Sequence, residues 1–192
     1  MFDDKRSKKV LLVAHCILNQ NAKIDRCAYY PGIMREVAEA LIEAGVGIIQ
    51  MPCPELIYLG LDRQADREAP TSVESEDTRV AGRMAEEGGL ACCRLFATAL
   101  VNQVQAYQKF GFEVLGIVGI NGSPTCGVET GWRNDQEVQG PGIFVQILRE
   151  ELGRQGISLP MRGVKGYEPR QAVAKLMELI AGRGGAAEGG EN

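Results

Sequence analysis

The amino-acid sequence predicts an α/β fold of three layers, in which a mostly parallel sheet of about four to five strands carries helices on both faces, as in Rossmann-like proteins. Three apolar runs without polar alternation lie at residues 10–14, 46–51 and 114–120. Such runs are typical of parallel strands that are buried on both faces. Segments with helical composition separate the runs, and this alternation implies right-handed crossover connections.

The segments between the runs can be assigned in order along the chain. Apolar residues recur at helical spacing over residues 34–42 and Gly45 supplies a stop, which predicts the first crossover helix. The polar stretch from Gln64 to Thr78 is longer than an ordinary connection, which favours a lid or a loop on the substrate side. Helical composition resumes after this stretch, breaks at residues 86–89 and continues to about Lys109.

The last part of the chain predicts a loop, two helices and a short strand. A surface loop is expected over residues 129–142, and an amphipathic helix over residues 144–152. Residues 157–160 have the composition of a fourth strand, and Pro160 places that strand at an edge of the sheet or ends it. A final helix is expected over residues 173–180.

Composition limits the domain organisation and the partners. Residues 1–181 suit a single α/β domain, and the Gly-rich residues 182–192 are predicted to be a disordered tail. The formal charge is −4, so we do not expect a nucleic-acid partner, because such partners select clustered lysine and arginine. No apolar stretch suits a membrane span or a signal peptide, so we expect a cytoplasmic protein without membrane association. A monomer and a homodimer both stay open.

Three cysteines hold the most informative positions in the sequence. Cys16, Cys53 and Cys126 each follow one of the apolar runs, and ligands of open α/β sheets gather at the carboxyl ends of the strands. Convergent thiols favour a soft metal or an iron–sulfur cluster, particularly in a reducing compartment where disulfides are disfavoured. These cysteines lack the paired spacing of structural zinc sites. The alternative is that each cysteine is a small buried apolar residue.

The motifs around these cysteines resemble a known family. They are Cys16-Ile17-Leu18-Asn19, Cys53-Pro54-Glu55 and Ser123-Pro124-Thr125-Cys126-Gly127. Their order and strand context, over roughly residues 9 to 160, resemble the thiouracil desulfurase-like family. The resemblance implies a 4Fe-4S cluster held by Cys16, Cys53 and Cys126, with the fourth iron free to bind the substrate sulfur. It also implies roles in the chemistry for Glu55 and Ser123.

The first motif departs from the family pattern. A second cysteine usually follows six residues after the first, within a Cys-Arg-Tyr-Asp run, whereas this chain has Ala22-Lys23-Ile24-Asp25. The chain therefore resembles a related subgroup with an altered substrate pocket, in which Asp25 is a candidate substrate contact. His15, the single histidine, either contacts the substrate or caps the strand end. Cys27 is the best substitute if Cys16 is not the first ligand.

These observations favour a desulfidase that converts C=S to C=O without net redox change and releases sulfide from a small thiolated compound such as a thio-nucleobase. Glu55 is placed to deprotonate the attacking water. Ser123 either binds the substrate or the leaving sulfide, or shapes its own turn. The alternatives are a non-catalytic iron–sulfur protein for electron transfer or redox sensing, and a structural metal-binding module that docks on a partner.

Overall fold

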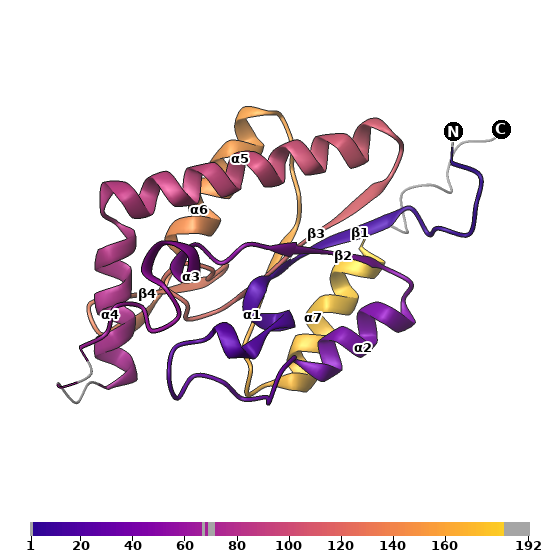
Figure 1. The fold of residues 1–192 in the computed structure, drawn as a ribbon. Helices are drawn as coiled ribbons and strands as arrows, with labels where there is room; N and C mark the ends of the chain where they lie inside the picture. The colour runs from indigo at the N-terminus through magenta and orange to yellow at the C-terminus, as the bar shows by residue number, and fades with distance from the viewer. Residues whose placement is uncertain (1, 67, 69–71, 183–192) are drawn as a thin grey trace.

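A four-stranded parallel sheet forms the centre of the structure, as expected (Figure 1). The computed structural model describes residues 2–66, 68 and 72–182. The strands run in the order β2 (Gly47–Met51), β1 (Lys9–Ala14), β3 (Glu113–Ile120) and β6 (Met161–Val164). All three strand pairs are parallel, and Ala14 pairs with Met51 at the carboxyl end of β1 and β2. The three strands that precede the cysteines are therefore neighbours in space.

Helices cover both faces of this sheet, which confirms the three-layer α/β fold (Figure 1). One face carries α2 (Arg35–Glu43) and α7 (Pro169–Ala181), and the other carries α5 (Glu87–Lys109) and α6 (Ile143–Arg154). The segments at the carboxyl ends of the strands are α1 (His15–Leu18), the 3-10 helix η1 (Gln20–Ala22), α3 (Pro54–Leu59) and α4 (Val73–Met84). No helix in the described ranges has both the length and the apolar character that a bilayer crossing requires.

The apolar runs differ in burial because of their places in the sheet. Residues 11–14 of β1 and 114–120 of β3 are buried, as expected for central strands. The prediction that the second run is also buried on both faces is wrong, because β2 is an edge strand and its residues Gly47, Ile48 and Gln50 are exposed. The first crossover helix matches α2, and Gly45 follows it with a positive φ of 64°.

The predicted fourth strand is displaced along the chain. Residues 157–160 have no strand structure, and β6 begins after them at Met161. Pro160 has no N–H to donate, but its carbonyl accepts a hydrogen bond from the Ile117 N–H at 3.0 Å, so pairing with β3 begins there. Strand β6 lies at the other edge of the sheet, which agrees with the edge position that Pro160 predicted.

Two segments predicted to be loops contain regular structure. Residues 129–142 include an antiparallel hairpin of β4 (Thr130–Arg133) and β5 (Gln136–Gln139). Its tight turn places Asn134 and Asp135 at positive φ, which asparagine and aspartate tolerate. The stretch from Gln64 to Thr78 gives way to α4 at Val73, because the Ser72 hydroxyl accepts the Ser75 N–H at 3.2 Å and caps the helix.

The predictions of domain extent and tail stay predictions. Of residues 182–192, only Gly182 lies within the described residues.

Candidate functional site: a pocket with three thiols

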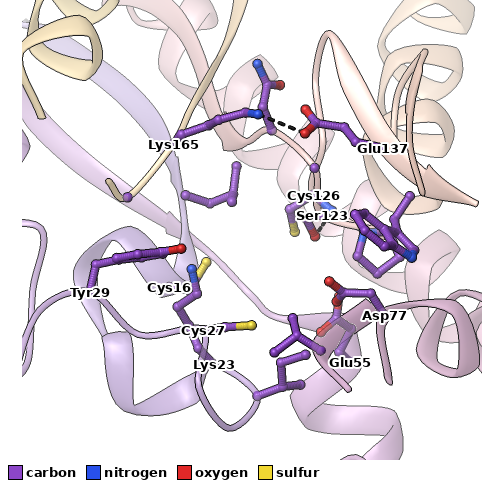
Figure 2. A pocket seen from close by; sticks show the side chains of 18 of the residues that line it. Cys16, Lys23, Cys27, Tyr29, Glu55, Asp77, Ser123, Cys126, Glu137 and Lys165 are labelled. Atoms are coloured by element: carbon purple, nitrogen blue, oxygen red, sulfur yellow. Dashed lines mark hydrogen bonds and ion pairs between the residues drawn. The ribbon is translucent and has the colours of Figure 1, made fainter. Parts of the chain in front are cut away.

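A pocket of about 380 Å³ lies at the carboxyl ends of β1, β2 and β3. Its lining includes Cys16, Cys53 and Cys126 together with Glu55 and Ser123. Figure 2 shows Cys16, Cys126, Ser123 and Glu55 around the same space. Parallel strands bring their carboxyl ends to one edge of a sheet, so three neighbouring strands deliver three thiols to one site.

Cys16 is positioned by a turn that the buried Gln20 holds in place. Cys16 lies on α1, directly after β1. Its carbonyl accepts a hydrogen bond from Gln20 Nε2 at 2.5 Å, while Gln20 Oε1 accepts the Tyr29 N–H at 3.1 Å. The Gln20 side chain therefore joins the turn of the first cysteine to the segment that carries Tyr29, and both line the pocket.

Cys53 is the N-cap residue of α3, and its sulfur accepts two hydrogen bonds. Its Sγ accepts the Leu56 N–H at 3.5 Å, in the position that a side-chain oxygen occupies in an ordinary N-cap. Arg63 Nη2 donates to the same sulfur at 3.9 Å. Hydrogen bonds to cysteine sulfur stabilise negative charge there and tune the potentials of iron–sulfur clusters.

Cys126 is placed by a turn that Ser123 shapes. Ser123 Oγ accepts the N–H groups of Thr125 at 3.2 Å and of Cys126 at 3.0 Å. This is the turn-forming role that the sequence left open for Ser123. The hydroxyl hydrogen is not used in these two bonds, so Ser123 keeps a donor that can point into the pocket.

Burial and neighbouring negative charge raise the pKa values of the pocket thiols. Burial raises the pKa of Cys126 well above its usual range, and neighbouring Cys53 and Cys16 raise it further. Burial and the charge of Glu55 raise the pKa of Cys53 to about 12. The raised pKa values keep these thiols protonated, so a metal that binds them must displace their protons.

The three thiols share one pocket lining without forming a compact site for a metal ion in the described part of the chain. Within the described ranges, no three histidine, cysteine, aspartate or glutamate side chains come together closely enough to hold one metal ion. Each thiolate of a 4Fe-4S cluster binds a different iron, so its ligands lie farther apart than those of one ion. The three thiols of this pocket lining are the residues that could hold such a group.

Glu55 reaches the pocket from the first turn of α3 and is paired with a buried arginine. Arg63 Nε lies 3.3 Å from Glu55 Oε2, and the Arg63 side chain is only 2% exposed. The same guanidinium donates to the carbonyls of Gly60 at 2.8 Å and Ala22 at 2.6 Å. Arg63 therefore fixes Glu55 and joins it to the segment that follows Cys16.

Helix α4 adds two more carboxyl groups to the pocket lining, those of Glu74 and Asp77. Val73, Glu74 and Asp77 of this helix line the pocket, so the predicted substrate-side position of this segment agrees with the structure although the predicted loop does not. Burial and the charge of Glu55 raise the pKa of Asp77 to about 7. Trp132 also lines the pocket, and its Nε1 donates a hydrogen bond to Thr78 Oγ1 of the same helix at 3.0 Å.

The opposite wall combines aromatic rings with lysines. Lys165 donates a hydrogen bond to Glu137 Oε2 at 2.8 Å, which raises the pKa of the lysine (Figure 2). The rings of Tyr29 and Tyr167 meet edge to face with their centroids 5.4 Å apart. Lys23 lies 5.7 Å from the centre of the Tyr29 ring. A planar ring can lie against this wall while polar groups contact its edge.

Two predicted site residues lie outside the pocket lining. Asp25 has a side chain that is 95% exposed and pairs with Arg26 at 3.6 Å. His15 leaves Nε2 buried without a hydrogen-bond partner among the described residues, and burial, followed by the charge of Arg63, lowers the pKa of His15. Cys27 does line the pocket, whereas Cys93 is buried in the core.

Comparison with known proteins identifies relatives. No protein-family model matches the chain. The uncharacterized protein MJ0003 of Methanocaldococcus jannaschii is 32% identical over 123 residues, which cover 64% of this chain and 70% of the archaeal one. The chain belongs to the family of MJ0003. Because MJ0003 is described as uncharacterized, this family assignment does not indicate an activity.

One solved structure is also similar. It is described as the 4Fe-4S-dependent thiouracil desulfidase TudS (DUF523Vcz), and the match covers 88% of this chain and 98% of that one at 20% identity. The TM-score is 0.42. A score this low establishes neither a shared fold nor a shared activity.

Several pocket residues have little signal in the sequence. Arg63 and Asp77 fall within or beside a polar stretch that has the composition of a solvated loop. Lys165 and Glu137 come from segments 28 residues apart. Only the fold shows that these side chains face the thiols.

Proposed function

We propose that the protein is a desulfidase with a 4Fe-4S cluster bound by Cys16, Cys53 and Cys126. It removes sulfur as sulfide from a small thiocarbonyl compound such as a thio-nucleobase and converts C=S to C=O. The observation that carries this proposal is the convergence of the three cysteines with Glu55 and Ser123 on one pocket. The resemblance of the three motifs to the thiouracil desulfurase-like family supports the same chemistry.

The residues of the pocket can supply what the hydrolysis of a thiocarbonyl needs. When bound, the cluster would supply an iron that accepts the substrate sulfur as a Lewis acid. Glu55 takes a proton from the water that adds to the carbon, and Arg63 holds its carboxylate in place. Ser123 donates its remaining O–H hydrogen to a heteroatom of the substrate. The tyrosines of the far wall hold the ring.

The charge of the pocket favours a small neutral substrate over a polyanion. The described lining holds four carboxyl side chains (Glu55, Glu74, Asp77 and Glu137) against three cations (Lys23, Arg63 and Lys165). Arg63 is buried and paired with Glu55, while Lys165 is paired with Glu137. Phosphate groups would meet no excess of positive charge at this site.

The Glu55→Gln variant tests the catalytic assignment. It keeps the shape of the side chain and removes the base, which should lower kcat by about 10² to 10⁴. Iron content and the cluster spectrum should stay unchanged. Glu150→Gln is the matched control, because Glu150 is exposed on α6 and lies outside the pocket lining. A wild-type rate in Glu55→Gln would show that another group activates the water.

Substrate class is tested by comparing free 2-thiouracil or 4-thiouracil with thiolated tRNA at two salt concentrations. The free bases should be converted with little dependence on salt. Activity confined to tRNA and steeply dependent on salt would show that a basic surface outside this pocket binds the substrate.

An electron-transfer or redox-sensing protein is the second candidate, and Cys27 is the observation that favours it. Its side chain also lines the pocket, so a fourth thiol is available, and carriers commonly have every iron bound by protein. Cys27→Ser separates the two functions. A desulfidase keeps its cluster spectrum and turnover in this variant, whereas a carrier loses iron or shifts its reduction potential.

A further inference from the structure

Asp77 occupies an unusual place on α4. The side chains that face inward from this helix recur at helical spacing, with Val80 and Met84 buried in the core and Val73 lining the pocket. Asp77 lies in the same stripe, four residues after Val73 and three before Val80. An acidic residue at an apolar position costs stability unless a partner compensates its charge.

The Asp77 carboxyl group lacks a direct partner among the described residues. Among the residues that the structure describes, its carboxyl group forms neither a hydrogen bond nor an ion pair, whereas the adjacent Glu76 pairs with Arg79 at 2.7 Å. Figure 2 shows the Asp77 carboxyl group pointing into the pocket on the same side as Glu55. The side chain is partly exposed and lines the pocket, so its available partner is water or a ligand in that pocket.

The two carboxyl groups have different surroundings. Glu55 has the guanidinium of Arg63 at 3.3 Å. The charged groups that act on Asp77 are Glu55 from α3, Glu74 and Glu76 from its own helix, and Lys23 from the segment after η1, and burial is the largest influence. Burial and the three glutamates raise the pKa of Asp77 to about 7, although Lys23 acts to lower it. Pairs of carboxyl groups whose environments differ in this way divide the acid and base roles in hydrolytic enzymes.

We propose that Asp77 is the general acid of the desulfidase reaction, so this inference rests on the proposed function. Glu55 takes a proton from water as the water oxygen bonds to the thiocarbonyl carbon, and the C=S π electrons move onto sulfur. The C–S bond then breaks as the added hydroxyl group releases its proton to solvent and becomes C=O, and Asp77 donates the proton that the departing sulfide receives. The proton held by Glu55 returns to Asp77 through solvent and restores both groups. The sum is C=S plus H₂O giving C=O plus HS⁻ and H⁺, with no electron transferred.

The pH–rate profile of Asp77→Asn tests this role. In the wild-type protein kcat should fall as the pH rises through about 7, because the acid must be protonated to act. In Asp77→Asn kcat should be lower by about 10² to 10⁴ and this alkaline limb should disappear, with KM and the cluster spectrum little changed. Asp135→Asn is the matched control, because Asp135 is exposed in the β4–β5 turn and its positive φ suits asparagine.

Infrared difference spectra provide a measurement that does not depend on turnover. A protonated carboxyl band should be present in the wild type at about pH 5.5, absent at about pH 8.5, and missing from Asp77→Asn at both. An unchanged alkaline limb in Asp77→Asn, or a band that persists in that variant, overturns the assignment of Asp77 alone. A wild-type protein that holds its cluster but converts no thiocarbonyl compound overturns the proposed function, and this role with it.

Discussion

Replacement of Arg63 by methionine tests the scaffold of the pocket. The guanidinium is buried and donates to Glu55 at 3.3 Å and to the carbonyls of Gly60, Leu61 and Ala22 at 2.8, 3.1 and 2.6 Å. Methionine has a similar length and removes all of these donors. It leaves the Glu55 side chain, which is only 13% exposed, without its counter-charge.

The expected loss of stability is large for a single substitution. Removing one partner of a buried ion pair typically costs about 3 to 5 kcal/mol. For a chain of this size each kcal/mol lowers Tm by about 2 to 4 °C, so Arg63→Met should lower Tm by about 6 to 20 °C. Arg63→Lys keeps the charge, but one ammonium group cannot reach all of the same acceptors. The Tm of this variant should therefore lie between those of the wild type and Arg63→Met.

Thermal unfolding followed by circular dichroism measures this difference. The control is Arg94→Met, which breaks the ion pair of Arg94 with Glu87. The two side chains are 53% and 83% exposed, respectively, and exposed pairs of this kind contribute about 0 to 1 kcal/mol to stability. Scans of protein treated with a chelator separate a loss of stability from a loss of cofactor. If Arg63→Met unfolds at the same temperature as Arg94→Met, the buried guanidinium does not hold the pocket together.

Two further predictions concern Asp77 and Gly127. Because the pKa of Asp77 is raised to about 7 in the folded protein, the fold retains a proton that the unfolded chain releases above about pH 4, and its stability falls as the pH rises between these values. In urea titrations, Asp77→Asn should therefore raise the free energy of unfolding more at pH 8 than at pH 5. The gain at pH 8 should be at most about 4 kcal/mol. An equal gain at the two pH values would contradict this prediction. Gly127→Ala should lower that free energy by about 1 to 3 kcal/mol, because its Cβ would meet the Thr130 carbonyl. Gly153→Ala in α6, where a Cβ meets nothing within 4 Å, should be neutral or stabilising, and similar effects for the two variants would refute the packing argument.

The sequence could predict the parts of the fold that depend on strong apolar patterns. The runs in β1 and β3 are continuous because these strands are central, so the pattern predicted them well. The run in β2 has the same composition, although this strand lies at an edge. Strand order determines this difference in exposure, and composition does not encode strand order.

Short polar elements were the part that the sequence could not predict. The hairpin of β4 and β5 has only four residues in each strand, and its signal is confined to the turn at Asn134 and Asp135. The cap of α4 depends on Ser72, within a stretch that otherwise has loop composition. The strand-end placement of the cysteines predicted their convergence, whereas Arg63 and Asp77 needed the tertiary structure.

Anaerobic purification followed by optical spectroscopy and assays of iron and sulfide tests the central claim most directly. The wild-type protein should be brown, absorb broadly near ~400 nm and contain about four iron and four sulfide per chain. Single alanine variants of Cys16, Cys53 and Cys126 should lose this absorbance, while Cys92→Ala, outside the pocket lining, should keep it. Zinc in place of iron would contradict the cluster altogether. Loss of iron in Cys27→Ala with full iron in Cys16→Ala would show that the first ligand is Cys27.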